Sequence, residues 1–115
     1  MRVLVVEDEE LLAAAIADGL RAEGFDVDVS HDGNDGLWRA REGSYDAIVL
    51  DVLLPGMNGY EVASAMRADA GLRGTCLVAL SGYAQPEDKQ RAGEAGFDAH
   101  VSKPTPLDEL SGLLH

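Results

Sequence analysis

The chain has 115 residues, enough for one domain with one core, and its content of 46% apolar and 26% charged residues is typical of a folded globular protein. A formal net charge of -12 repels nucleic acid and anionic membrane surfaces, so we expect neither direct nucleic-acid binding nor membrane insertion. The apolar stretches are shorter than a membrane span and the first residues resemble a strand rather than a leader peptide, which predicts a cytoplasmic location.

The first part of the chain predicts two strands that are each followed by a helix. Residues 2–6 are a continuous apolar strand, whereas residues 25–30 alternate apolar with polar side chains, which indicates an edge strand. The helix after the first strand covers residues 9–23, and the helix after the second begins after Asp32 and ends at Gly43. The apolar stripe predicted for the first of these helices consists of Leu12, Ala15, Ile16, Gly19 and Leu20.

The central part repeats this order. Residues 45–50 and 75–80 are continuous apolar runs, typical of strands that are covered on both faces. Between them, a helix is predicted from Gly59 to about Asp69. Its inward-facing residues are expected to be Val62, Ala63 and Met66.

The last part predicts a helix from Pro86, a strand over residues 98–101 and a final helix from Pro106 to near the terminus. Five alternations of strand and helix with short connections predict an α/β fold with a parallel sheet and helices on both faces. In such sheets, ligands bind beyond the carboxyl ends of the strands. The polar groups at those ends are therefore the candidates for a site.

Acidic side chains follow two of the predicted strands. Glu7 and Asp8 come directly after the first strand, and Asp51 closes the third. If these strands are neighbours, the carboxylates meet, and their repulsion requires a bound cation, a trapped proton or a chemical task that uses the charge. Ser81 and Lys103 end two further runs and add a hydroxyl and an ammonium, a set that suits phosphoryl chemistry.

Four segments of the sequence form a pattern by their order and spacing: Val5-Val6-Glu7-Asp8-Glu9, Asp51-Val52-Leu53-Leu54-Pro55-Gly56-Met57-Asn58-Gly59, Ala79-Leu80-Ser81-Gly82 and Ala95-Gly96-Phe97-Asp98-Ala99-His100-Val101-Ser102-Lys103-Pro104. Together they resemble the receiver domain of two-component response regulators, over the whole chain from residue 1 to 115. The resemblance implies a flavodoxin-like, CheY-like fold with five helices around a five-stranded parallel sheet of strand order 2-1-3-4-5.

By this resemblance, Asp51 is the phosphoacceptor of a phosphorelay and Mg²⁺ is the cofactor, with Mn²⁺ or Ca²⁺ as substitutes. A carboxylate is a weak nucleophile toward an anionic donor, so a divalent cation is needed to neutralise charge. The implied metal ligands are Asp8, Asp51, the backbone carbonyl of Leu53, and Glu7 either directly or through water.

The resemblance also assigns the remaining polar residues. Ser81 is expected to hydrogen-bond a phosphoryl oxygen, and Lys103 to pair with another. His100 stands where the family carries a residue that moves inward on activation, so Ser81 and His100 form the expected switch. The change is expected at the surface made by the fourth helix, the fifth strand and the fifth helix.

The implied partners are a sensor histidine kinase or a histidine phosphotransfer protein as the donor, a downstream protein of unknown identity, and a second copy in a phosphorylation-dependent homodimer. The chain is expected to catalyse only its own phosphorylation and dephosphorylation. A haloacid dehalogenase type phosphatase would carry a second Asp two residues after the nucleophile, where Leu53 stands instead. A binding module that keeps the fold without being phosphorylated remains the second alternative.

Three further predictions concern two loops, the context of the domain and the lifetime of an acyl phosphate. Residues 33–36 and 55–59 are interpreted as turns rather than phosphate-binding loops. Because the chain ends soon after the last predicted helix, it is expected to be a single-domain regulator or a piece of a larger protein, and residues 96–100 are similar to receivers joined to hybrid histidine kinases. The apolar Leu53 and the bulky Tyr83 are expected to shield an acyl phosphate from water and to slow its hydrolysis.

Overall fold

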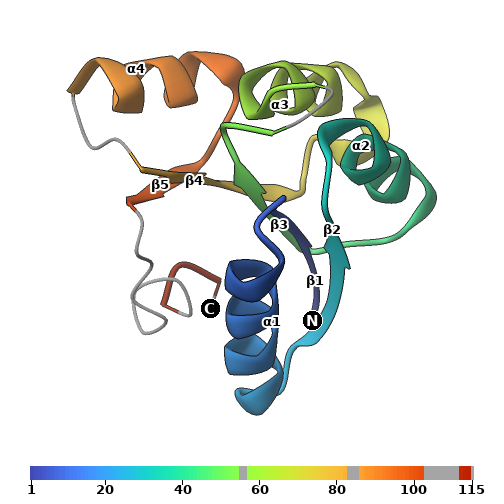
Figure 1. Cartoon of the computed structure of the whole chain (residues 1–115). Coiled ribbons are helices and arrows are strands. Elements are labelled where there is room, and N and C mark those ends of the chain that lie inside the picture. Colours follow the sequence, from blue (N-terminus) through green and yellow to red (C-terminus); the bar gives the residue numbers. More distant parts are fainter. Residues whose placement is uncertain (55–56, 83–85, 103–111, 115) are drawn as a thin grey trace.

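A computed structural model describes residues 1–54, 57–82, 86–102 and 112–114 (Figure 1). Strands and helices alternate along the chain, as the sequence predicts, and residues 112–114 are helical. The predicted helix from Pro106 otherwise lies outside the described residues. The elements are β1 (Arg2–Val6), α1 (Glu10–Ala22), β2 (Asp26–Ser30), α2 (Gly33–Glu42), β3 (Ala47–Asp51), α3 (Gly59–Ala68), the short 3-10 helix η1 (Ala70–Leu72), β4 (Cys76–Ser81), α4 (Pro86–Ala95) and β5 (Ala99–Ser102).

The strands form one parallel sheet of order β2-β1-β3-β4-β5, which confirms the order implied by the family resemblance. The alternating strand β2 lies at an edge, as predicted. In the register of β1 and β3, Val6 pairs with Leu50. The carboxyl ends of β1 and β3 are therefore level, and the residues that follow them are neighbours.

Helices cover both faces of the sheet, with α1 on one face and α2, α3 and α4 on the other (Figure 1). Because side chains alternate along a strand, Leu4 and Val6 belong to the core under α2 and α3, whereas Val3 and Val5 belong to the core under α1. The central part of the sheet is covered on both faces, since residues 3–6 and 47–50 are fully buried. The strand ends are thus held on a rigid support.

The buried stripe of α1 is shifted around the helix relative to the predicted one. Ala13 and Ala17 are buried together with Ile16 and Leu20, while Ala15 is exposed. Each residue advances about 100° around a helix, so positions three and four apart share a face. Ala15 lies outside the stripe that residues 13, 16, 17 and 20 form around the helix, so its prediction as a core residue was wrong.

The turn interpretation of residues 33–36 is also wrong, because α2 begins at Gly33. The N-cap residue is Asp32, as predicted, and its side chain accepts a hydrogen bond of 2.7 Å from the N–H of Asp35. A Cβ atom at Gly36 would lie 2.8 Å from Cγ1 of Val6, and one at Gly33 would collide with the carbonyl oxygen of Met57. The two glycines therefore serve close packing of α2 rather than a turn.

The pKa of Asp35 is lowered, first by the hydrogen bond from the Ser30 hydroxyl (2.5 Å) and then by that from the Arg39 guanidinium (2.7 Å). A lowered folded-state pKa means that the ionised form stabilises the fold above the ordinary value of 3.8 and that this contribution is lost as the pH falls through the folded pKa. We expect Asp35→Asn to cost more stability near pH 6 than near pH 3, measured by urea unfolding of both proteins. An equal cost at both pH values would contradict this contribution of the charge.

Arg67 joins three segments around the carboxyl end of α3. Its guanidinium donates to the carbonyl oxygens of Gly96 (2.8 Å) and Thr75 (2.9 Å) and pairs with the carboxylate of Asp98 at 2.6 Å. The Asp98 carboxylate also accepts a hydrogen bond of 2.8 Å from the N–H of Leu77. Further bonds from Arg67 reach the carbonyl oxygens of Leu72 and Arg73, both at 3.2 Å.

The outer edge of β2 is partly occupied by a side chain. The guanidinium of Arg21, near the end of α1, donates a hydrogen bond of 2.7 Å to the carbonyl oxygen of Val27. Asp26 is exposed and Asp28 is half-buried. No helix in the described part of the chain is long and apolar enough to cross a membrane.

Candidate functional site

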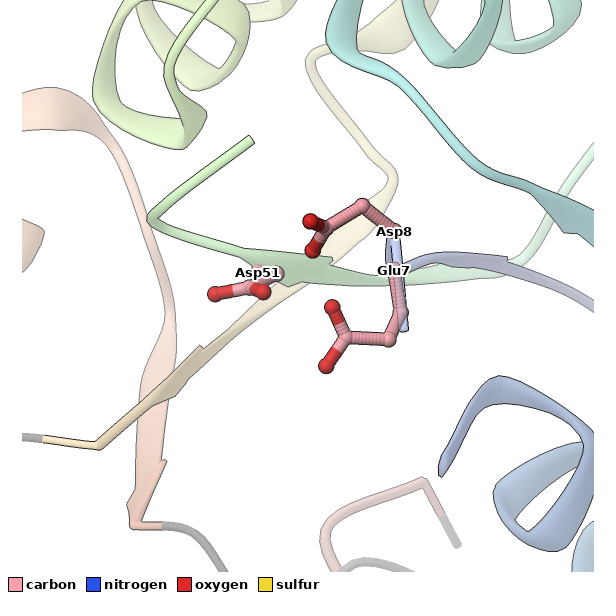
Figure 2. Close-up of side chains that lie close together, drawn as sticks. All are labelled: Glu7, Asp8 and Asp51. Atoms are coloured by element: carbon pink, nitrogen blue, oxygen red, sulfur yellow. The ribbon is translucent and has the colours of Figure 1, made fainter. Parts of the chain in front are cut away.

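Glu7, Asp8 and Asp51 converge at the carboxyl ends of β1 and β3, as the sequence predicts (Figure 2). One carboxylate oxygen from each residue lies within 4.8 Å of the others. The convergence follows from the strand register, because β1 ends opposite Leu50 and the chain carries Glu7 and Asp8 beyond that point. Three acidic groups from two separate segments therefore share one small volume.

The burial of these groups makes the cluster distinctive. Glu7 and Asp51 are only 0% and 2% exposed, whereas Asp8 is exposed. Burying two carboxylates close together is costly unless an opposite charge or hydrogen bonds compensate. An all-oxygen donor set with one exposed member fits a hard divalent cation such as Mg²⁺, which prefers carboxylate ligands and retains bound waters. The donor chemistry therefore fits the predicted metal.

The backbone after β3 holds the Asp51 side chain in place. The N–H of Leu53 donates a hydrogen bond of 3.0 Å to Oδ1 of Asp51. The Leu53 side chain is 59% exposed and does not take part in a core. This bond leaves the second carboxylate oxygen, Oδ2, on the side of Asp51 away from the Leu53 amide.

Gly59 allows α3 to begin directly against the strand that carries Asp51. Its N–H donates to the carbonyl oxygen of Val52 at 3.1 Å, and a Cβ atom there would lie 2.6 Å from Cα of Val52 and would collide with the carbonyl oxygen of Asp51. A side chain at this position must displace backbone rather than a flexible group. Position 59 therefore requires glycine for steric reasons, because a side chain there would collide with the backbone of Asp51, the candidate nucleophile.

We expect Gly59→Ala to lower the free energy of unfolding by about 3 kcal/mol, since overpacking against backbone is relieved only by moving it. Urea unfolding would measure the loss. Gly74→Ala is the matched control, because a Cβ atom at Gly74 meets nothing within 4 Å. Equal stability of the two variants would contradict the steric argument.

Ser81 and His100 lie on neighbouring strands. Ser81 is the last residue of β4 and is 1% exposed, and the register pairs it with Ser102, two residues after His100. Since residues two apart on a strand face the same side, Ser81, Ala79 and His100 share one face of the sheet. Lys103 and Tyr83 lie outside the described residues, so their predicted places at the site stay predictions.

The structure also places a residue at the site that the sequence analysis missed. Nδ1 of His31 lies 3.0 Å from the carbonyl oxygen of Glu7. The two residues are 24 positions apart and belong to different loops. The only signal in the sequence was a histidine directly after an edge strand. Its contact with Glu7 can be inferred only once β1 and β2 are known to be neighbours.

The chain belongs to the response regulator receiver domain family, whose sequence profile matches residues 3–115. It is 41% identical over 110 residues to the transcriptional regulatory protein DltR of Streptococcus agalactiae, covering 96% of this chain and 48% of that protein. It is 40% identical over 109 residues to the DNA-binding response regulator MtrA of Mycolicibacterium smegmatis, covering 95% of this chain and 46% of that protein. The chain thus spans about half the length of these curated relatives.

Solved structures show the same fold. The chain matches the receiver domain of the sensor histidine kinase PA1611 of Pseudomonas aeruginosa with a TM-score of 0.91 and 31% identity, covering 98% of this chain and 93% of that one. A magnesium ion is coordinated in the active site cleft of that receiver. Chemotaxis response regulator CheY4 of Vibrio cholerae matches with a TM-score of 0.93 and 28% identity, covering 98% of this chain and 94% of that one.

These comparisons confirm the predicted class: the chain is a receiver domain of two-component signalling. Its relatives include both transcriptional regulators and the receiver of a histidine kinase. Attachment to a hybrid histidine kinase therefore stays a prediction.

Proposed function

We propose that Asp51 accepts a phosphoryl group and that the resulting aspartyl phosphate switches the domain between two conformations. The observation that carries the proposal is the convergence of Glu7, Asp8 and Asp51, with the buried Asp51 fixed through Oδ1 by the Leu53 amide. The bond holds the Asp51 carboxylate in one orientation, and orientation of a nucleophile is a large part of the catalysis of phosphoryl transfer.

In the proposed reaction, Oδ2 of Asp51 attacks the phosphorus of a phosphohistidine on the donor protein. The new bond joins this oxygen to phosphorus, the bond between phosphorus and the imidazole nitrogen breaks, and the nitrogen takes up a proton. The donor class is a sensor histidine kinase or a histidine phosphotransfer protein, as the two-component family implies.

Glu7, Asp8 and Asp51, together with the backbone carbonyl of Leu53, would hold the metal ion. When bound, Mg²⁺ neutralises charge on the transferring group and its acceptor, and Mn²⁺ or Ca²⁺ is proposed to substitute. Asp8 is the exposed ligand and therefore the entry point for the ion. The two buried carboxylates would supply the attraction that retains it.

The charge added at Asp51 is proposed to draw Ser81 and Lys103 toward the phosphoryl oxygens, with Ser81 donating its hydroxyl and Lys103 its ammonium. His100 lies on the same face of the sheet as Ser81 and lines a hollow of about 150 Å³ between α4 and β5. Ala92 and Gly93 form part of that hollow and leave room for an imidazole. Movement of His100 would therefore change the surface of α4, β5 and the last helix.

A partner that binds one state of that surface more tightly would read the signal. We propose a downstream protein or a second copy of the chain as that partner and a cytoplasmic location for the exchange. Only the chain's own phosphorylation and dephosphorylation would be catalysed. Leu53 in place of a general acid two residues after Asp51 argues against turnover of an external phosphate ester.

Incubation with Mg²⁺ and acetyl phosphate tests the proposal, with intact-protein mass and free phosphate as readouts. One phosphoryl group per chain is expected. Phosphate release over many turnovers would indicate a phosphatase, and no mass change with acetyl phosphate or with a phosphorylated histidine phosphotransfer protein would indicate an inert binding module. Either of the last two results would overturn the proposal.

The exposed Leu53 side chain is proposed to hinder water from reaching an acyl phosphate on Asp51. We expect Leu53→Asn to shorten the half-life of phosphorylated protein severalfold, because an amide orients water where an apolar side chain excludes it. The half-life is measured in Mg²⁺ after removal of the donor, with the exposed Leu11→Asn on α1 as the control. A longer half-life for Leu53→Asn than for wild type would refute the shielding.

A further inference from the structure

The backbone of Glu7 is held on both sides. Its N–H donates a hydrogen bond of 2.9 Å to the carbonyl oxygen of Ser30, which extends the pairing of β1 with β2 by one residue. Its carbonyl oxygen lies 3.0 Å from Nδ1 of His31. Because a carbonyl oxygen can only accept, this second contact is a hydrogen bond when Nδ1 carries the proton.

The imidazole stands where the sheet would otherwise supply a backbone donor. In a parallel pair, a residue whose N–H bonds to one partner accepts, through its own carbonyl, from the N–H two residues further along that partner strand. For Glu7 that donor would be Asp32. Asp32 instead turns away as the extended N-cap of α2, and no backbone bond from it to Glu7 occurs among the described residues.

The loop that carries His31 is itself fixed at both ends. Ser30 is 1% exposed and its hydroxyl donates to Asp35, while Asp32 caps α2. His31 is exposed and belongs to neither core, so packing does not explain its position. The contact with Glu7 is the hydrogen bond that the described structure gives its ring.

We propose that His31 is a positioning residue for the metal site, in which its Nδ1–H replaces the missing backbone donor and fixes the peptide group that joins Glu7 to Asp8. This inference rests on the proposed function, since it concerns the same carboxylates. The orientation of that peptide group sets the direction in which the two neighbouring side chains leave the backbone. Without the bond, the peptide group can rotate, and the carboxylates of Glu7 and Asp8 no longer both point toward Asp51.

The bond predicts a protonation pattern that can be observed directly. At alkaline pH, where imidazole is neutral, nitrogen chemical shifts of His31 should show the tautomer with the proton on Nδ1. This measurement needs no metal and no phosphoryl donor. A proton on Nε2 alone would overturn the inference, because Nδ1 would then face the carbonyl as a second acceptor.

The functional test compares Mg²⁺ affinity by calorimetry, together with acetyl phosphate phosphorylation, in wild type, His31→Ala and His31→Asn. We expect His31→Ala to weaken Mg²⁺ binding about fivefold, the effect of about one hydrogen bond. His31→Asn should retain near wild-type affinity, because its amide nitrogen lies about where Nδ1 does and can donate. Asn34→Ala, at an exposed residue in the first turn of α2, is the control.

The unfolding midpoint of each variant in EDTA separates positioning from stability. A merely structural His31 would lower the midpoint without changing Mg²⁺ affinity, and that result would overturn the inference while the proposed function stands. Equal affinity of wild type and His31→Ala would do the same. A wild type that neither binds Mg²⁺ nor gains a phosphoryl group would overturn the proposed function and this inference with it.

Discussion

Replacing Asp51 with Asn is expected to abolish phosphorylation and, without divalent cations, to stabilise the protein. The amide oxygen of Asn can still accept the hydrogen bond from Leu53, so the backbone after β3 keeps its geometry. The side chain loses the anionic oxygen that is proposed to attack phosphorus. Incorporation from acetyl phosphate should therefore fall below detection.

The gain in stability follows from the crowding of like charges. Two charges 4.8 Å apart, the limit within which one oxygen of each carboxylate lies, repel by about 3 kcal/mol at an effective dielectric constant of about 20, and neighbouring groups offset part of this. We expect a net gain of about 1 kcal/mol for Asp51→Asn in EDTA. Mg²⁺ should stabilise the wild type more than the variant and reduce the difference.

Thermal unfolding in EDTA and in Mg²⁺, combined with intact-protein mass, measures both effects. Asp26→Asn makes the same chemical change at the far end of β2 and serves as the control. It should accept phosphate normally and show no difference that depends on Mg²⁺. Phosphate incorporation by Asp51→Asn at the wild-type rate would show that another residue is the acceptor.

Replacing Arg67 with Met is expected to produce a large loss of stability. The guanidinium donates to four carbonyl oxygens and to the Asp98 carboxylate, and its side chain is 22% exposed. Methionine fills a similar length but donates nothing, so several partly buried acceptors lose their partner at once. We expect the free energy of unfolding to fall by about 3 kcal/mol and the melting temperature by about 10 °C.

Chemical and thermal unfolding would measure this loss. Arg73→Met is the matched control, because Arg73 is exposed and contributes its backbone carbonyl rather than its side chain to the network. Arg67→Lys should recover part of the stability, since a single ammonium reaches fewer acceptors than a planar guanidinium. If Arg67→Met were as stable as Arg73→Met, the network would contribute little.

Much of the fold could be predicted because its signals are local. Continuous apolar runs identified β1, β3 and β4, the alternating pattern identified β2 as an edge, and Asp32 and Gly43 marked the ends of α2. The order of the strands came from the family resemblance rather than from the pattern. Periodicity alone placed Ala15 on the wrong face, because neighbouring small residues in α1 fit the stripe about equally well.

The acidic cluster was predictable for a simple geometric reason, since parallel strands bring their carboxyl ends to one edge of the sheet. The supporting contacts were not predictable. The glycines of α2 were interpreted as turn residues because their role depends on Val6 and Met57, which are distant in sequence. The contact of His31 could not be predicted because its partner is a backbone carbonyl oxygen, which every residue type carries.

The contact between Arg21 and Val27 bears on how copies of this protein meet. An unpaired strand edge is a template for the strand of another molecule, and uncontrolled pairing of this kind leads to aggregation. Here a guanidinium already occupies one carbonyl of that edge, and a second β2 would bring Asp26 and Asp28 against acidic residues of the same kind. Pairing between two β2 edges is thereby disfavoured, so a second copy of the chain would meet the first through another surface.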